Sequence, residues 1–452
     1  MVRQWLHRAM AAITIASSLA SAQEPALPPL NADSNVVRKP APPGENAALD
    51  SMRAKNGESL RVSLITYGPT DVVWERFGHD AIAIRDTITG QDIVYNWGEF
   101  DFEQPNFYKR FLTGETSYWI SAYPTPDFNA VYVRQNRSIR VQQLAMTAVQ
   151  KAALLELVSW NLLEANKYYR YDYYRDNCAT RVRDALDHVL NGRVKLSLDT
   201  GVTSLTWRSE TERVTASNYP VYAGIELALG RNADTPLTNW GASFMPERLA
   251  DAAATIILKN ADGQRYSLVS SDSVVFASSR VPMPIDPPDR TVMAALLGLA
   301  IAGIIALLAD AESKFLRGVL VGFATLWYLI GGILGTALLL AGTATKHIPY
   351  MGSNTTLWQI HPLLLFAALF LPVAFRRREA TQTPRILAAL IALFSVFGAL
   401  LQLVPMYRQH SGVVLAVMVP IHLALAIGLL RLPIGTPRRR FSAAPAAVPR
   451  AS

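Results

Sequence analysis

The chain of 452 residues contains one cysteine, Cys178, in the segment YDYYRDNCATRVRDAL. A lone cysteine cannot form an internal disulfide, so it is a buried inert thiol, an intermolecular bridge or a nucleophile. Asp176 or Asn177 is a suitable N-cap for a helix that starts close to Cys178. The free N–H groups and the dipole at a helix start lower the pKa of a thiol, which favours the nucleophile.

A cysteine nucleophile needs a base, which is usually a histidine. Only His79 and His188 lie outside the signal-like N-terminus and the apolar C-terminal half of the chain. On a continuous helix His188 would stand about 15 Å from Cys178, ten residues further along. His79, which follows Gly78 at the start of an expected strand, is therefore the candidate base.

A third group should hydrogen-bond the far ring nitrogen of His79 and fix its tautomer. A hairpin centred near Thr89-Gly90 would bring His79 opposite residues 99–101. Glu99 and Asp101 would then share the face of His79, whereas Asn96 has the wrong parity unless a bulge intervenes. We favour Asp101 as the orienter, with Asn96 and Glu99 as alternatives.

Simpler interpretations remain open for these residues. Cys178 could be a small core residue in the first turn of a helix, and His79 a polar residue at a strand end. The chain has no H-E-x-x-H, Walker, dinucleotide-binding or G-x-S-x-G motif. With one cysteine and no paired histidines at ligand spacing, no metal site and no cofactor are expected.

Charge divides the chain into two parts. From Thr291 onward there are 13 Lys and Arg against 3 Asp and Glu, a net charge of +10, so the first 290 residues carry a net charge of −2. The basicity belongs to an apolar half and is not a nucleic-acid-binding surface, so no nucleic-acid partner is expected.

The C-terminal half contains five apolar stretches that come close to the length needed to cross a membrane. Lys and Arg concentrate in the first and third loops between them and in the tail, which the positive-inside rule places in the cytoplasm. The segment before the first stretch is then periplasmic. The stretches are Val292–Ala309, Leu316–Ala341, Leu357–Phe375, Ile386–Val404 and Val413–Leu430.

The N-terminus supports this topology. Arg3 and Arg8 precede an apolar stretch that ends at Ala20-Ser21-Ala22, which is typical of a cleaved signal peptide. We therefore predict a signal peptide over 1–22, a flexible tether over 23–58, a periplasmic domain over 59–288, a five-helix transmembrane domain over 289–432 and a cytoplasmic basic tail over 433–452. Strand and helix patterns mix without strict alternation in the periplasmic domain, which indicates an α+β fold.

Four polar residues of the membrane half are also candidates. His361 and His422 fall inside expected spans, where ionisable side chains are costly and often functional. His347 and Asn354 lie in the periplasmic loop between the second and third helices. They are candidate substrate-binding residues that would contact a lipid headgroup, with interhelical hydrogen bonding as the alternative.

The motifs WERFGHDAIAIRD, YNWGEFDF, PNFYKRFLTGETSYWI and YRYDYYRDNCATRVRD occur in this order. They resemble the successive motifs of the DUF4105 family, also called the Lnb N-terminal periplasmic domain. The membrane half is similar to the five-helix region that accompanies that domain, including the segment from Thr345 to Trp358. This resemblance implies an inner-membrane protein of a Gram-negative bacterium.

The resemblance also implies a papain-like domain related to NlpC/P60 and circularly permuted, as in lecithin:retinol acyltransferase-like enzymes. It implies that Cys178 and His79 form the catalytic pair and, because position 99 of the motif is often a small polar residue, it favours Asp101 over Glu99. The implied activity is lipoprotein N-acyl transfer. A phospholipid would donate the acyl chain through a Cys178 thioester, and a lipoprotein would accept it on the α-amine of its diacylglyceryl-cysteine.

Two alternatives belong to other functional classes. The same pair could serve a periplasmic cysteine peptidase or amidase that acts on peptidoglycan, although such a substrate gives no reason for five membrane helices. In a non-enzymatic membrane scaffold, Cys178 would only pack, and its replacement would leave function intact.

Overall fold

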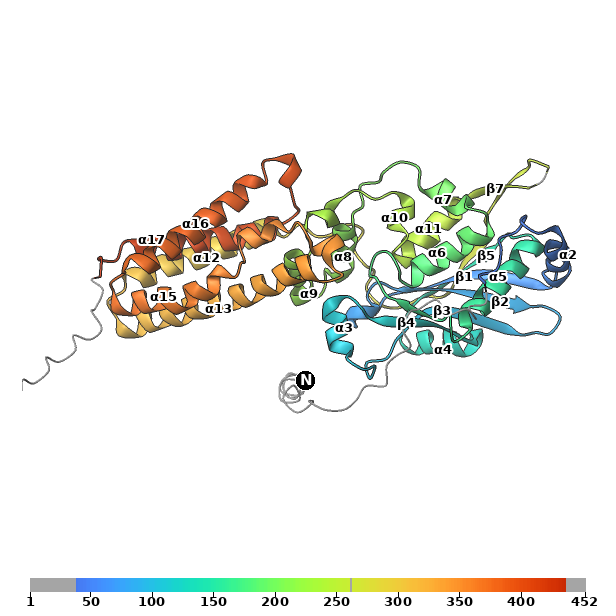
Figure 1. The fold of residues 1–452 in the computed structure, drawn as a ribbon, viewed down its shortest axis with the longest axis horizontal. Helices are drawn as coiled ribbons and strands as arrows, with labels where there is room; N and C mark the ends of the chain where they lie inside the picture. The colour runs from blue at the N-terminus through green and yellow to red at the C-terminus, as the bar shows by residue number, and fades with distance from the viewer. Residues whose placement is uncertain (1–37, 261, 436–452) are drawn as a thin grey trace, which may run out of the picture.

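The computed structural model describes residues 38–260 and 262–435. These residues form a mixed α/β domain followed by a bundle of long apolar helices, and Figure 1 shows the two parts side by side along the long axis of the molecule. The predicted signal peptide, the first part of the predicted tether and most of the basic tail lie outside the described residues.

The domain is built on a seven-stranded antiparallel sheet with the order β6-β4-β3-β2-β1-β5-β9. A two-stranded ribbon of β7 and β8 lies apart from it. The strands of both sheets are β1 (Leu60–Tyr67), β2 (His79–Asp86), β3 (Asp92–Glu99), β4 (Ser117–Pro124), β5 (Ile139–Leu144), β6 (Tyr168–Arg170), β7 (Ile257–Lys259), β8 (Arg265–Ser267) and β9 (Val269–Phe276).

Helices cover both faces of the central strands, which explains why the residues of β1 and β2 are almost all buried or partly buried. One face packs against α5 (Ala148–Leu162), α6 (Cys178–Val189) and α11 (Pro246–Thr255). The other face packs against α4 (Thr125–Arg134) through Tyr132. Figure 1 shows α6 and α11 above the sheet and α4 below it. The predicted mixture of strands and helices is confirmed.

The remaining helices of this domain are short. They connect the sheet to the membrane part or line the ends of the strands. They are α2 (Ala47–Asn56), η2 (Val73–Glu75), α3 (Phe107–Thr113), α7 (Arg193–Leu198), α8 (Trp207–Thr215), α9 (Tyr219–Ala228), η3 (Arg231–Asp234) and α10 (Asn239–Ala242).

The predicted flexible tether is wrong for residues 38–58. Asn46 caps α2 by accepting a hydrogen bond from Leu49 N, and α2 packs against α5. Arg53 is 1% exposed and donates from Nη2 to Glu156 Oε2 at 2.6 Å. The sequence did not predict this helix, because the segment has low hydrophobicity. An ion pair, and not an apolar face, attaches α2 to α5.

Five helices of the C-terminal part are long and apolar enough to cross a membrane, which confirms the predicted number. The second begins earlier and ends later than predicted, and the third is preceded by a 3₁₀ turn. They are α12 (Thr291–Asp310), α13 (Lys314–Ala344), η4 (Thr355–Trp358) with α15 (Leu363–Arg377), α16 (Gln382–Leu401) and α17 (Gly412–Leu430). Two short helices, α14 (Ile348–Met351) and η5 (Pro405–Tyr407), lie in the loops between them.

The loop between α13 and α15 binds the α/β domain directly. Lys346 N donates to Thr113 O at 2.9 Å at the end of α3, and Gly230 N donates to Tyr350 O at 2.7 Å before η3. Through these backbone hydrogen bonds, α3 and the segment after α9 are fixed next to the ends of the membrane helices (Figure 1).

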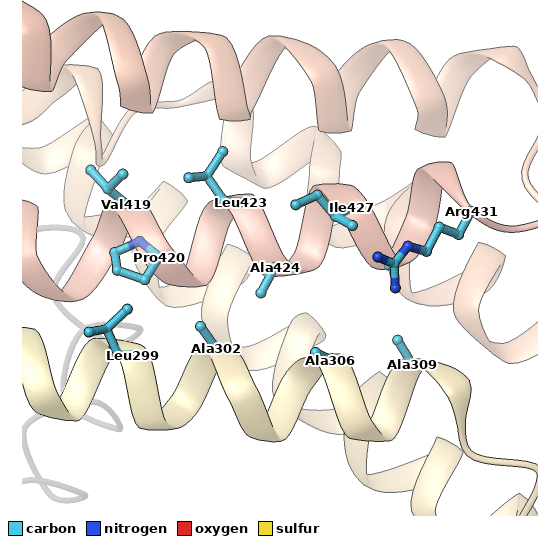
Figure 2. A pocket seen from close by; sticks show the side chains of 11 residues that line it. Leu299, Ala302, Ala306, Ala309, Val419, Pro420, Leu423, Ala424, Ile427 and Arg431 are labelled. Atoms are coloured by element: carbon cyan, nitrogen blue, oxygen red, sulfur yellow. The ribbon is translucent and has the colours of Figure 1, made fainter.

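The bundle also has an apolar groove of about 400 Å³ between α12 and α17 (Figure 2). Small side chains of α12, including Ala302 and Ala306, leave space opposite Leu423 and Ile427, and Arg431 lies at one end. This groove belongs to the membrane part, whereas Cys178 lies in the α/β domain, so it is separate from the candidate site described below.

Candidate active site

The thiol of Cys178 is placed by the start of α6. Asn177 accepts from Thr180 N at 2.9 Å, and Thr180 Oγ1 accepts from Asn177 N at 2.8 Å, which forms a reciprocal capping box. Asn177 also donates to Phe244 O at 2.9 Å, which fastens the cap to the rest of the domain. Asn177 is therefore the N-cap, while Asp176 forms an ion pair with Arg181. The predicted helix start at Cys178 is confirmed.

The apolar face of α6 presses this helix start against the sheet. Ala179, Val182 and Leu186 are buried in the main core, and α6 contacts β2 and β3. Cys178 is half-buried and has no disulfide partner. The sulfur is thus held between the helix start and the two strands that carry the candidate base and its partner.

His79 and Cys178 meet at Gly98. A Cβ atom added to Gly98 would lie 3.3 Å from His79 Cε1 and 3.6 Å from Cys178 Cβ. Those two atoms are therefore separated by no more than the sum of these distances, about 7 Å. Gly98 has a φ of +117°, which L residues rarely adopt. The glycine keeps the space between base and thiol clear, and the structure brings together the predicted pair.

The hydrogen-bond partner of His79 is Asn96. His79 Nε2 lies against Asn96 Oδ1 in a short hydrogen bond, and Asn96 Nδ2 donates to Glu99 Oε1 at 2.7 Å. Because the carboxylate of Glu99 only accepts, the amide must turn its oxygen toward His79. His79 Nε2 then carries the proton, which leaves Nδ1 as the basic nitrogen. Glu99 acts on His79 through Asn96.

The choice of Asp101 as orienter is wrong. Asp101 is exposed, and its carboxylate accepts from the backbone N–H of Glu103 at 2.8 Å. The physical reason is the register of the hairpin, in which Ile82 pairs with Tyr95. If this register continues for three residues, His79 lies opposite Gly98. The side chain of Asn96, two residues before Gly98, then points to the same face of the sheet as His79. This alignment differs by one residue from the predicted one.

Burial sets the protonation of both groups. It raises the pKa of the Cys178 thiol, although the backbone N–H groups of Asp80, Ala179 and Cys178 act in the opposite direction. Burial also lowers the pKa of His79, partly offset by the hydrogen bond to Asn96. The helix start therefore does not give the low thiol pKa expected from sequence. At neutral pH the site holds a neutral thiol and a neutral imidazole, the state in which His79 can act as a base.

Two charged residues near the site were not predicted from the sequence. Arg137 is buried, donates to Gly68 O at 2.6 Å and lies over the ring of Tyr132. Its positive charge partly opposes the burial that raises the pKa of Cys178 and adds to the burial that lowers the pKa of His79. No motif marks Arg137, because it reaches the site from the loop between α4 and β5.

Asp80 is the second such residue, and it is fully buried beside the thiol. Burial raises the pKa of its carboxyl, and the charge of Cys178 acts in the same direction. Thr66 donates to its Oδ1 at 2.6 Å, while Oδ2 has no hydrogen-bond partner among the described residues. Burial therefore disfavours a negative charge on Asp80 beside the sulfur.

A chain of aromatic rings connects the site to the periplasmic loops of the bundle. The rings of Tyr118 and Tyr171 stack at 4.1 Å, and the charge of Cys178 raises the pKa of both phenols after the larger effect of burial. The ring centroids of Tyr171 and Tyr173 are 5.8 Å apart, and those of Tyr173 and His347, which stack, are 5.9 Å apart. These contacts form an aromatic chain from the neighbourhood of the thiol to the loop between α13 and α15.

The two loop candidates have different environments. His347 is buried, its Nε2 lies 3.2 Å from Phe111 O, and its Nδ1 has no partner among the described residues. Asn354 donates to Leu227 O at 2.8 Å and accepts from Thr356 N at 3.0 Å. Asn354 therefore joins the bundle to α9, and of the two only His347 contacts the aromatic chain.

The intramembrane histidines lie apart from the thiol, in the bundle. His422 Nδ1 lies 3.0 Å from Ser395 Oγ, which also donates to Gln359. Neither ring nitrogen of His361 has a partner among the described residues. Of the predicted site residues, the structure therefore gathers Cys178, His79 and Asn96, with Glu99 in contact with Asn96.

The fold and the membrane helices define a multi-pass membrane protein with a periplasmic N-terminal domain. Residues 50–213 match the model of a family described as the Lnb N-terminal periplasmic domain. This match covers β1 to α8 and includes His79, Asn96 and Cys178. No curated protein and no solved structure matches the chain.

Proposed function

We propose that this protein is a membrane-bound, cysteine-dependent lipoprotein N-acyltransferase. It moves an acyl chain from a phospholipid to the α-amine of a diacylglyceryl-cysteine at a lipoprotein N-terminus. The observation that carries the proposal is the meeting of Cys178 and His79 at Gly98, with Asn96 holding the far nitrogen of the imidazole. Cysteine, histidine and asparagine in these roles form the catalytic set of papain-like enzymes.

In the first half-reaction, His79 Nδ1 takes the proton of Cys178 as the sulfur attacks the ester carbonyl of a phospholipid. The tetrahedral intermediate collapses, the C–O bond breaks, and the departing lysophospholipid alkoxide receives the proton from His79. An acyl-thioester remains on Cys178. Dividing the transfer at a covalent intermediate replaces one difficult step with two easier ones.

In the second half-reaction, the neutral α-amine attacks the thioester carbonyl and loses a proton to His79. The C–S bond breaks, the thiolate recovers the proton, and the amide product leaves. The hydrogen bond to Asn96 Oδ1 stabilises the imidazolium that forms in both halves. Burial lowers the pKa of His79 and so keeps the imidazole neutral before each attack, which leaves Nδ1 free to accept a proton.

The oxyanion of each tetrahedral intermediate forms beside the sulfur. The backbone N–H groups of Asp80, Ala179 and Cys178 converge on this region. Donors that are already aligned stabilise the developing charge without reorganisation. Because burial raises the pKa of the Asp80 carboxyl, a repulsive negative charge beside that oxyanion is disfavoured.

The position of α3 supports a lipid substrate. Tyr108, Phe111 and Leu112 are exposed on this helix, Lys109 is exposed beside them, and the helix end is bonded to the loop that follows α13. Aromatic and basic side chains together are typical of the membrane interface. A phospholipid at this surface would lie near the aromatic chain that extends toward Cys178, and tethering raises its effective concentration.

The finer assignments belong to the same proposal. The domain is a papain-like, NlpC/P60-related fold in the circularly permuted order, since His79 precedes Cys178. The protein lies in the inner membrane of a Gram-negative bacterium with a cytoplasmic C-terminus. The excess of Lys and Arg in the first and third loops between the helices supports this orientation.

The test is mass spectrometry of lipoprotein N-termini in a strain depleted of its own N-acyltransferase. Expression of this protein is expected to convert free α-amines to N-acylated amines, and Cys178→Ala is expected to abolish the conversion. Free amines that persist despite correct membrane insertion would overturn the proposal.

The same experiment separates the alternatives. A peptidoglycan hydrolase would leave the lipoprotein amines free and alter muropeptides in a Cys178-dependent manner. A scaffold would retain its function in Cys178→Ala. Asn161→Ala serves as a folding control, because Asn161 accepts from Trp97 in the same core without contacting His79.

A further inference from the structure

Three metal-binding side chains meet at the junction between the α/β domain and the bundle. They are Glu212 from α8, Glu226 from α9 and His410 from the loop between α16 and α17. One carboxylate oxygen from each glutamate and one ring nitrogen of the histidine all lie within 4.8 Å of one another. Sequence spacing could not reveal this cluster, because its members come from three separate elements.

The two glutamates are buried with unused oxygens. Both are 1% exposed, and neither Glu212 Oε1 nor Glu226 Oε2 has a hydrogen-bond partner among the described residues. The nearby guanidinium of Arg208 forms its ion pair with Asp234 at 2.6 Å, and its other hydrogen bonds go to backbone oxygens, so its N–H groups do not bind either glutamate carboxyl. Two such buried carboxyls are costly to leave unpartnered.

The third ligand is held in place by its own loop. The backbone N–H of His410 donates to Asp234 Oδ2 at 3.1 Å. The preceding Gln409 donates to Leu229 O at 3.2 Å, which anchors the loop to the α/β domain. On the other side of the cluster, Tyr222 OH donates to Glu226 Oε1 at 3.2 Å, so one oxygen of that carboxylate is oriented and the other remains available.

We propose that Glu212, Glu226 and His410 bind a divalent transition-metal cation, with Zn²⁺ as the best match. One imidazole and two carboxylates form a borderline donor set that suits zinc better than magnesium or calcium, which prefer oxygen alone. Bonds of 2.0–2.2 Å in a tetrahedron separate neighbouring ligand atoms by about 3.4 Å. The ligand atoms would therefore have to move closer together, and the exposed ring of His410 is free to make this small movement. A water molecule would complete the coordination.

This ion would connect the two parts of the protein. Its ligands come from α8 and α9 of the periplasmic domain and from the loop that leads into α17. Binding would add a strong contact to the hydrogen bonds of the junction and fix the orientation of the domain on the bundle. The inference is independent of the acyltransferase chemistry, because none of the three ligands belongs to the thiol site.

The test uses the full chain in detergent, stripped of metal with EDTA and free of any affinity tag. We expect it to bind about one Zn²⁺ per chain by elemental analysis and titration calorimetry. Because even outer-shell changes weaken metal sites by about 10- to 100-fold, His410→Ala and Glu212→Gln should each weaken zinc binding by at least about 10-fold. His188→Ala and Glu247→Gln, outside the cluster, are the matched controls.

Zinc should also raise the melting temperature of the wild type and both controls but not of His410→Ala. Because His410 is exposed, this variant folds even if Glu212→Gln does not. A wild type that binds no zinc would overturn the site. Zinc binding that is unchanged in His410→Ala would overturn it equally.

Discussion

The hydrogen bond between Asn96 and His79 offers a sharp prediction. Replacing Asn96 with Ala removes the acceptor for His79 Nε2 and the donor to Glu99, while both neighbours remain in place. The imidazole then loses the contact that fixes its tautomer and stabilises its protonated form. Activity should fall, although Cys178 and His79 are both present.

The size of the loss follows from the charge that develops on His79. A hydrogen bond to a charged group contributes about 1.5–3 kcal/mol. Since 1.36 kcal/mol in the barrier changes a rate tenfold, Asn96→Ala should slow thioester formation by about 10- to 150-fold. Glu99→Gln keeps Asn96 in place and weakens only its orientation, so its loss should be about tenfold or smaller.

The assay follows hydroxylamine-sensitive transfer of a labelled acyl chain from phospholipid vesicles to the purified protein. Asn161→Ala is the matched control, because it also removes a buried asparagine. Asn161 accepts a hydrogen bond from Nε1 of Trp97 at 2.7 Å, and Trp97 is next to Asn96 on β3. This control should lose about 1–3 kcal/mol of stability and keep its rate. If Asn96→Ala reacts within twofold of the wild type while His79→Ala is inactive, the assigned role of Asn96 is refuted.

Three further predictions follow from the same contacts. Gly98→Ala should lower the rate of thioester formation more than tenfold, because the new Cβ would lie only 3.3 Å from His79 Cε1. Gly90 has a similarly positive φ but open space around it, so Gly90→Ala should keep the rate, and equal losses in the two variants would contradict this. The rate at which iodoacetamide alkylates Cys178 should still rise with pH above pH 9, because burial raises the pKa of this thiol from 9.0. A rate that reaches its plateau below pH 8 would disprove the assigned burial. Asn354→Ala should weaken the junction by about 1–3 kcal/mol and speed limited proteolysis between the two parts, because its amide donates to Leu227 O; an unchanged cleavage rate would argue against that role.

The helix start at Cys178 could be predicted because its determinants are local. The Asn177 cap and the apolar positions of α6 lie within one short segment. The choice of His79 as the base needed only the elimination of other histidines. The five membrane helices were predictable for a similar reason, since length and hydrophobicity suffice to define them.

The orienting residue depended on a register that the sequence does not determine. A shift of one residue in a hairpin reverses which side chains share a face. Pairing of Ile82 with Tyr95 therefore exchanges the predicted Asp101 for Asn96. Sequence position near a helix start also suggested a low thiol pKa, but burial outweighs the backbone donors at Cys178.

Other features depend on contacts between distant segments. Arg137 reaches the site from a loop without a motif, and Glu212 meets His410 only after the domain docks on the bundle. The helix around Arg53 is stabilised by Glu156, about a hundred residues away in the chain. Tertiary contacts of this kind leave no periodic or spaced pattern in the sequence.

The central claim is that Cys178 carries the acyl chain, and intact-protein and peptide mass spectrometry tests it most directly. Purified protein is incubated with a phospholipid that has one isotope-labelled acyl chain, and a synthetic diacylglyceryl-cysteine peptide is then added. We predict the mass of one acyl group on the Cys178 peptide, removed by hydroxylamine and transferred to the amine of the added peptide. Labelled N-acyl peptide formed by Cys178→Ala, or no acyl mass on Cys178 of the wild type, would contradict the account.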